Sequence, residues 1–209
     1  MTPTRGQRPD DAEAAWLARL DATITPAPAA PALIHLPRPH PATLPPDALL
    51  AQCDLTRGRS GGPGGQHRNK VETLVTLDHT PTGVQAHAGE RRSASENKHE
   101  ALWRLRLALA THVRCPVPAG DARSTLWRSR CAGSGKRAGR VSVSPTHDDY
   151  PAMLAEALDV VFACGLDMPA AGARLCCSAS QLVKLVKDHP PAIVLLNAHR
   201  SANGLRTLK

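Results

Sequence analysis

The stretch at residues 59–70 constrains the fold of this chain more than any other part of its sequence. It reads Arg-Ser-Gly-Gly-Pro-Gly-Gly-Gln-His-Arg-Asn-Lys. Four glycines and a proline within six residues exclude the interior of a helix or strand, because glycine is costly to order and proline lacks an N–H donor. The chain must therefore form a backbone-exposed loop here. Because arginine and lysine flank the glycines, its peptide N–H groups could point at an oxyanion or a phosphate.

The residues on either side of this loop predict a small α+β domain. Residues 52–57 form a candidate strand, and residues 72–78 and 84–87 predict a hairpin whose turn contains Pro81, Thr82 and Gly83. Residues 93–113 predict a long helix that begins with a capping box made by Ser93 and Glu96. We therefore expect a few short strands and one long helix around a single core.

The two ends of the chain predict different structures. Residues 10–20 could form a short helix, and the proline- and alanine-rich residues 22–49 predict a mostly extended linker in a disordered N-terminal part. Residues 116–145 are basic and poor in large apolar residues, which indicates a partly ordered connector. The C-terminal part is then predicted to be all-α.

Four helices are expected in this C-terminal part. The first covers residues 151–164, the second starts at a capping Asp167, the third is capped by Ser178 with Gln181, and the fourth ends near Gly204. A three-residue turn between the second and third helices is the spacing of a helix-turn-helix, and Lys184 and Lys187 lie one turn apart on the third. An ordinary helical bundle is the alternative, and the zero net charge of this part favours it.

The positive charge of the chain is confined to its middle. Residues 55–140 carry 16 Lys and Arg against 6 Asp and Glu, whereas residues 1–54 have a net charge of −2 and residues 141–209 a net charge of zero. Such a distribution suits a polyanionic partner. Aromatic residues make up only 2% of the chain, which favours recognition of an RNA backbone or shape over base stacking.

Several other classes of protein are disfavoured. The six cysteines show no Cys-x-x-Cys spacing and are predicted to be reduced thiols, and the histidines lack metal-ligand spacing, so we expect neither a metal nor a cofactor. No apolar run reaches the length of a membrane span and no signal peptide is recognisable, which predicts a cytoplasmic protein. A P-loop is excluded because Lys70 is followed by Val71 rather than by Ser or Thr.

The glycine loop resembles the GGQ loop of class I peptide chain release factors and of their ribosome-rescue relatives. The resemblance rests on residues 60–66, continues through Asn69 and Lys70 to residues 77–84, and includes Arg92-Ser93 and Asn97-Lys98. It extends roughly over residues 52–113. It implies the GGQ domain fold and the hydrolysis of the ester that links a nascent peptide to tRNA in the ribosomal peptidyl-transferase centre.

The resemblance also implies roles for individual residues. Gly64 and Gly65 would adopt a conformation barred to other residues and direct the backbone N–H of Gln66 at the oxyanion, while the Gln66 side chain would shape the pocket for water. The family's glutamine is commonly methylated, so a glutamine methyltransferase is an expected partner. The predicted RNA-binding residues are Arg57, Arg59, Ser60, Arg68, Asn69, Lys70, Arg92 and Lys98. Asn69 and Lys70 could instead cap the turn after the loop, and Arg92 could be a solvated residue at the start of the helix.

Two departures from the family narrow the prediction. The residues before the loop cannot supply the large domain that reads stop codons, and residues 200–209 are not the Lys/Arg-rich tail of the usual rescue hydrolases. We therefore expect a codon-independent, ribosome-dependent carboxylic ester hydrolase that acts in ribosome rescue as a monomer. A non-catalytic ribosome- or RNA-binding adapter is the first alternative, and a nucleic-acid regulator led by the C-terminal helices is the second.

The expected organisation has four segments. Residues 1–46 would be the N-terminal extension and linker, residues 47–114 the GGQ domain, residues 115–147 the basic connector, and residues 148–209 the helical C-terminal domain. The predicted partners are ribosomal RNA of the peptidyl-transferase centre and peptidyl-tRNA.

Overall fold

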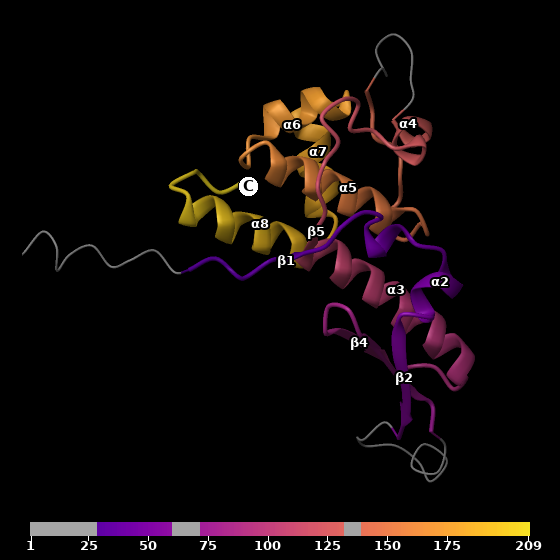
Figure 1. The fold of residues 1–209 in the computed structure, drawn as a ribbon. Helices are drawn as coiled ribbons and strands as arrows, with labels where there is room; N and C mark the ends of the chain where they lie inside the picture. Colours follow the sequence, from indigo (N-terminus) through magenta and orange to yellow (C-terminus); the bar gives the residue numbers. More distant parts are fainter. Residues whose placement is uncertain (1–28, 60–71, 132–138) are drawn as a thin grey trace, which may run out of the picture.

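The computed structural model describes residues 29–59, 72–131 and 139–209. Its class is α+β, as predicted: a three-stranded sheet and a two-stranded sheet are combined with helices (Figure 1). The predicted N-terminal helix at residues 10–20 lies outside the described residues. Within the described part of the chain, no helix is long and apolar enough to cross a membrane.

The three-stranded sheet confirms the predicted strand and hairpin. Its strands are β2 (Cys53–Gly58), β3 (Leu74–His79) and β4 (Val84–Ala88), antiparallel and in the order β2-β3-β4. The turn between β3 and β4 places Gly83 at a φ of +67°, a conformation that favours glycine, and the Gly83 N–H donates to the His79 carbonyl at 2.8 Å. The turn chemistry seen in the sequence therefore determines the hairpin.

Helix α3 (Ala94–His112) joins the sheet to the rest of the molecule. It starts at the predicted cap, where the Ser93 hydroxyl accepts a hydrogen bond from the Glu96 N–H at 3.4 Å. It contacts β3, β4 and the C-terminal helix α5 (Tyr150–Ala163). Its buried apolar side chains therefore belong to one hydrophobic core that is continuous from the sheet to the C-terminal helices.

Helix α5 is the centre of the C-terminal helices, and Figure 1 shows it between α3 and α6–α7. Every residue from Tyr150 to Val161 is buried. Around it lie α6 (Met168–Leu175), α7 (Ala179–Lys187) and α8 (Pro190–Ala202), so the four predicted helices are confirmed. The predicted caps are also present, because Asp167 accepts from the Ala170 N–H at 3.0 Å and Ser178 from the Gln181 N–H at 3.2 Å.

The proline-rich segment differs from the extended linker that its composition predicts. Its described part contains β1 (Ile34–His35), the short helix η1 (Pro41–Thr43) and α2 (Pro46–Leu50). Strand β1 pairs in parallel with β5 (Val113–Arg114), and η1 contacts both α3 and α5. Proline is tolerated here because each of the two short helices has it in the first turn, where no intrahelical donor is needed.

The basic connector is also more regular than predicted. It contains α4 (Thr125–Arg130), whose Trp127 is completely buried and donates its indole N–H to the Leu175 carbonyl at 2.9 Å. One large aromatic residue thus anchors a segment that is otherwise short of apolar side chains. The boundaries of the four expected segments stay a prediction.

Candidate active site

The predicted catalytic residues lie outside the described part of the chain. Gly64, Gly65 and Gln66 belong to residues 60–71, as do four of the predicted RNA-binding residues, Ser60, Arg68, Asn69 and Lys70. The described residues form the frame from which this segment departs and to which it returns. That frame consists of the end of β2, the start of β3 and the start of α3.

The two ends of the frame are held by the strand ladder. Gly58, the last residue of β2, lies opposite Leu74, the first residue of β3, and Arg57 lies opposite Val75. Arg59 forms an ion pair with Glu72 at 3.8 Å, but both side chains are more than half exposed, so this pair contributes little. The backbone pairing, rather than the ion pair, therefore fixes the separation of the two ends.

Asn97 ties the returning end of the segment to α3. Its side chain is completely buried, and its amide nitrogen donates to the Thr73 carbonyl at 2.6 Å and to the Arg91 carbonyl at 3.0 Å. Its amide oxygen accepts from the Arg91 N–H at 2.9 Å. One side chain thus holds the last residue before β3 and the residues before α3 in a fixed relation.

The four described residues among the predicted RNA-binding set lie around this frame. Arg57 is on β2, Arg59 follows that strand, Arg92 precedes α3, and Lys98 is in the second turn of α3. The three arginines are exposed and Lys98 is half-buried. In Figure 1 the end of β2, which pairs with the start of β3, lies at the bottom of the molecule, opposite α6 and α7. Positive charge therefore surrounds the point where residues 60–71 leave and rejoin the sheet.

Two residues of this frame were missing from the predicted site. Asn97 carried a signal, because a spacing of four residues places it with Ala101, Leu105 and Leu109 on the buried face of the helix. Arg104 carried only the local spacing of its ion pair with Glu100, four residues before it, at 3.2 Å. Folding adds the contacts that join α3 to β4 and the residues after it: Arg104 donates to the His87 carbonyl at 2.9 Å and forms an ion pair with Glu90 at 2.8 Å. Both residues position the frame rather than contribute chemistry.

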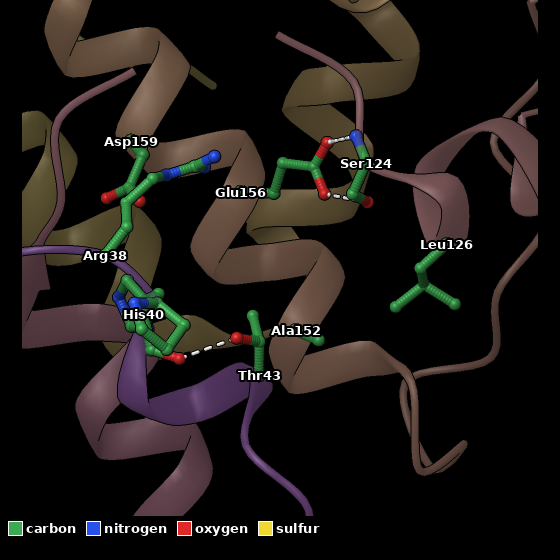
Figure 2. A pocket seen from close by; sticks show the side chains of 9 residues that line it. Arg38, His40, Thr43, Ser124, Leu126, Ala152, Glu156 and Asp159 are labelled. Atoms are coloured by element: carbon green, nitrogen blue, oxygen red, sulfur yellow. Dashed lines mark hydrogen bonds between the residues drawn. The ribbon is translucent and has the colours of Figure 1, made fainter. Parts of the chain in front are cut away.

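A separate cavity of about 530 Å³ lies between the proline-rich segment, the start of α4 and α5 (Figure 2). On one wall Glu156 accepts hydrogen bonds from the Ser124 N–H at 2.7 Å and the Ser124 hydroxyl at 2.5 Å. On the other wall His40 and Asp159 lie close to Arg38. The carboxylate of Glu156 is thus used to hold the start of α4.

Two residues of the cavity wall, His40 and Asp159, form with the buried Cys115 a cluster that resembles a metal site but fits hydrogen bonding better. One ligand atom each of His40, Cys115 and Asp159 lies within 4.8 Å of the others. The His40 ring, however, already accepts from the Ala42 N–H at 3.1 Å and contacts the Val113 carbonyl at 3.2 Å. Asp159 accepts from the Cys115 N–H at 3.0 Å and pairs with the buried Arg114 at 3.4 Å. Both ring nitrogens are in use and a guanidinium cation lies beside the carboxylate, so we assign the cluster a structural role.

We expect this cluster to make the stability of the protein depend on pH. Burial, as the largest cause, lowers the pKa of His40 from 6.5 to about 4. Between these values the unfolded chain binds a proton that the folded chain does not, so the free energy of unfolding falls as the pH falls. His40→Gln should make this dependence shallower by up to about 1.4 kcal/mol per pH unit, as measured by urea unfolding between roughly pH 7 and 5.

Asp159 acts in the opposite direction, because burial raises its pKa from 3.8 to about 6. Here the folded chain binds the extra proton, and stability rises as the pH falls through this window. Wild type and His40→Gln both retain Asp159, so the difference between their pH dependences of the free energy of unfolding reports on His40. The exposed His87 offers a control as His87→Gln. An unchanged slope in the His40 variant would show that the ring does not resist protonation.

The comparisons with known proteins concern the part of the chain around the loop. A family model described as RF-1 domain matches residues 50–138. The chain is 40% identical over 83 residues to peptide chain release factor 1 of Rhodospirillum rubrum, which is 40% of this chain and 23% of that protein. It is 50% identical over 82 residues to the chloroplastic peptide chain release factor PrfB1 of Arabidopsis thaliana, 35% of this chain and 18% of that protein.

A third relative is peptide chain release factor 1 of Nitrosomonas europaea, 36% identical over 97 residues, which cover 46% of this chain and 26% of that protein. The chain therefore spans about a quarter or less of the length of these three relatives. No solved structure matches the chain significantly.

Proposed function

We propose, from the premise that this chain belongs through its RF-1 domain to the class I peptide chain release factor family, that it hydrolyses the ester bond of peptidyl-tRNA on the ribosome. We propose further that it does so without reading a codon, in the rescue of stalled ribosomes. Ribosomal RNA of the peptidyl-transferase centre and peptidyl-tRNA are the partners. The protein acts as a cytoplasmic monomer, and Gln66 is the residue that a glutamine methyltransferase would modify.

One observation carries this proposal: the Gly64-Gly65-Gln66 sequence stands between two chain ends that the sheet and α3 hold rigidly. The pairing of Gly58 with Leu74 fixes the ends, and Asn97 fixes the residue before β3. A loop whose ends are held loses less entropy when it is ordered in the ribosomal site. The rigid frame supports a role as a positioned catalytic loop more than a role as a free docking segment.

The chemistry needs few groups from the chain itself. A water must be positioned against the ester carbonyl, and the developing oxyanion must be stabilised by a donor. In this proposal the backbone N–H of Gln66 donates to the oxyanion, and the glycines allow the backbone to present that N–H. The charged residues around the frame contact RNA phosphates and bring the loop to the reacting ester.

The described residues on both sides of the RF-1 domain pack against its long helix. The described proline-rich residues contact α3 and α5, and the C-terminal helices contact α3. Both flanks are thus used to extend the hydrophobic core. In this proposal the ribosome is recognised through RNA rather than through the sequence of the mRNA.

Peptide release from ribosomes that hold peptidyl-tRNA is the test. We expect wild type to release the peptide at similar rates with a stop codon, a sense codon or no codon in the A site. Gly65→Ala and Gln66→Ala should lower the rate on the order of 100-fold, because the oxyanion donor is misplaced or the water pocket altered. Gly120→Ala is the matched control, since a Cβ at Gly120 would meet no atom within 4 Å.

Ribosome binding is measured in the same samples. Binding by all variants together with loss of release only in the loop variants supports the hydrolase. Binding without release by wild type would reject it in favour of a non-catalytic adapter. Release that requires a stop codon would reject codon independence alone.

A further inference from the structure

The α6–α7 pair forms a tightly packed corner that matches helix-turn-helix spacing. Residues 176–178 separate the two helices, and Cys176 takes a left-handed conformation with a φ of 54°. A Cβ at Gly172 would meet the Cys177 carbonyl oxygen at 2.7 Å and the Ala179 nitrogen at 3.2 Å. The first helix thus lies directly against the backbone of the turn, which fixes the direction in which α7 leaves it.

One face of α7 is exposed and carries two lysines. Leu182, Leu185 and Val186 are buried, whereas Ser180, Lys184 and Lys187 are exposed at intervals of four and three residues. We call these three exposed residues the α7 basic face. Neither lysine forms an ion pair among the described residues, and the face has no aromatic side chain. It therefore presents charge rather than an apolar or stacking surface.

The zero net charge of residues 141–209 does not describe the surface of this region. Of its six acidic residues, Glu156 and Asp159 are buried and hold partners inside the protein. Asp149 pairs with Arg130 at 2.5 Å, and Asp167 caps α6. Asp148, Asp167 and Asp188 stay exposed, and Asp188 follows α7 directly. The positive charge is therefore a local property of the face of α7 that carries Lys184 and Lys187.

The basic connector approaches the amino end of α7. The Cys131 thiol lies 3.8 Å from the Cys176 carbonyl oxygen, and a Cβ at Gly139 would lie 2.6 Å from the same oxygen. Arg140, which follows Gly139, is exposed. The excess positive charge of the middle of the chain is therefore continued, at this corner, by the charge of α7.

We propose that the α7 basic face, with Arg140 at its amino end, binds the phosphate backbone of double-helical RNA. The choice of RNA rests on the proposed function, in which the chain acts on the ribosome. Because the deep major groove of A-form RNA does not admit a helix, the contact is made to phosphates and depends on shape rather than on sequence. Lysines suit this role as point charges. Figure 1 places α6 and α7 at the end of the molecule opposite the frame of the glycine loop, so this is a second RNA contact.

The test uses the full chain, an RNA duplex of about 20 base pairs and a DNA duplex of the same sequence. Binding is followed by fluorescence anisotropy over a series of salt concentrations. For Lys184→Glu/Lys187→Glu we expect RNA affinity to fall about 10-fold or more. The slope of log affinity against log salt concentration should become shallower by an amount that corresponds to up to about two lost phosphate contacts. The control Arg206→Glu/Lys209→Glu changes the net charge equally at two exposed residues of the C-terminal end and should bind like wild type.

Three outcomes would overturn the proposal: unchanged RNA affinity in the α7 variant, an equal loss in the control, or lysine-dependent binding that is tighter to DNA than to RNA. Circular dichroism establishes that both variants are folded. Peptide release separates this proposal from the proposed function. If wild type releases no peptide but binds duplex RNA through the two lysines, the hydrolase fails and the RNA surface stands; normal release with no such binding rejects the surface alone.

Discussion

Asn97→Leu is expected to destabilise the protein by about 3 kcal/mol and to lower peptide release on the order of 10- to 100-fold. Leucine has nearly the same size but leaves the Thr73 carbonyl and both backbone groups of Arg91 without their partner. A buried polar group that loses its partner costs about 1–3 kcal/mol. Release falls because the end of residues 60–71 is no longer held against α3. Urea unfolding measures the first effect, and the release assay measures the second.

The neighbouring Ser95 provides the control for this variant. It is exposed in the first turn of α3, so Ser95→Ala should leave both stability and release close to wild type. Asn97→Asp is a sharper comparison, because it keeps the acceptor for the Arg91 N–H and removes both donated hydrogen bonds. If Asn97→Leu is destabilised while release by the folded protein is normal, Asn97 supports the fold but does not position the loop.

Asp159→Ala is expected to destabilise the protein by about 3–5 kcal/mol. Its carboxylate pairs with Arg114, and the two side chains are only 1% and 3% exposed. The substitution leaves a guanidinium cation buried and also removes the acceptor for the Cys115 N–H. Since the pair joins β5 to α5, the loss should appear as a lower midpoint in urea unfolding of the whole chain.

Two further variants show whether the cost comes from the orphaned charge. Asp148→Ala removes an exposed carboxylate near the start of α5 and should change stability by less than about 0.5 kcal/mol. Arg114→Met/Asp159→Leu removes both charges and should recover part of the lost stability, because an apolar pair needs no desolvation of ions. A double variant that is less stable than either single variant would contradict this explanation.

Local sequence signals were sufficient to predict most of the secondary structure. The hairpin follows from its turn residues and the alternation of its strands, and α3, α6 and α7 begin at the serine and aspartate caps visible in the sequence. These signals work because the interacting groups are within a few residues of each other. The signals failed for the proline-rich segment, where His40 reaches a partner 73 residues away. In the connector they missed α4, whose Trp127 reaches a partner 48 residues away.

The sequence by itself determined the order of the helices and strands, the family resemblance and the chemistry expected at Gly64, Gly65 and Gln66. Each of these depends on residues that are close together in the sequence. The tertiary structure alone decided which backbone groups Asn97 binds and that Arg104 joins α3 to β4. It also decided that Glu156 and Asp159 are withdrawn from the surface while Lys184 and Lys187 stay on it. Burial and long-range hydrogen bonds depend on which distant segments meet, and a net charge counted along the chain does not distinguish a buried carboxylate from an exposed one.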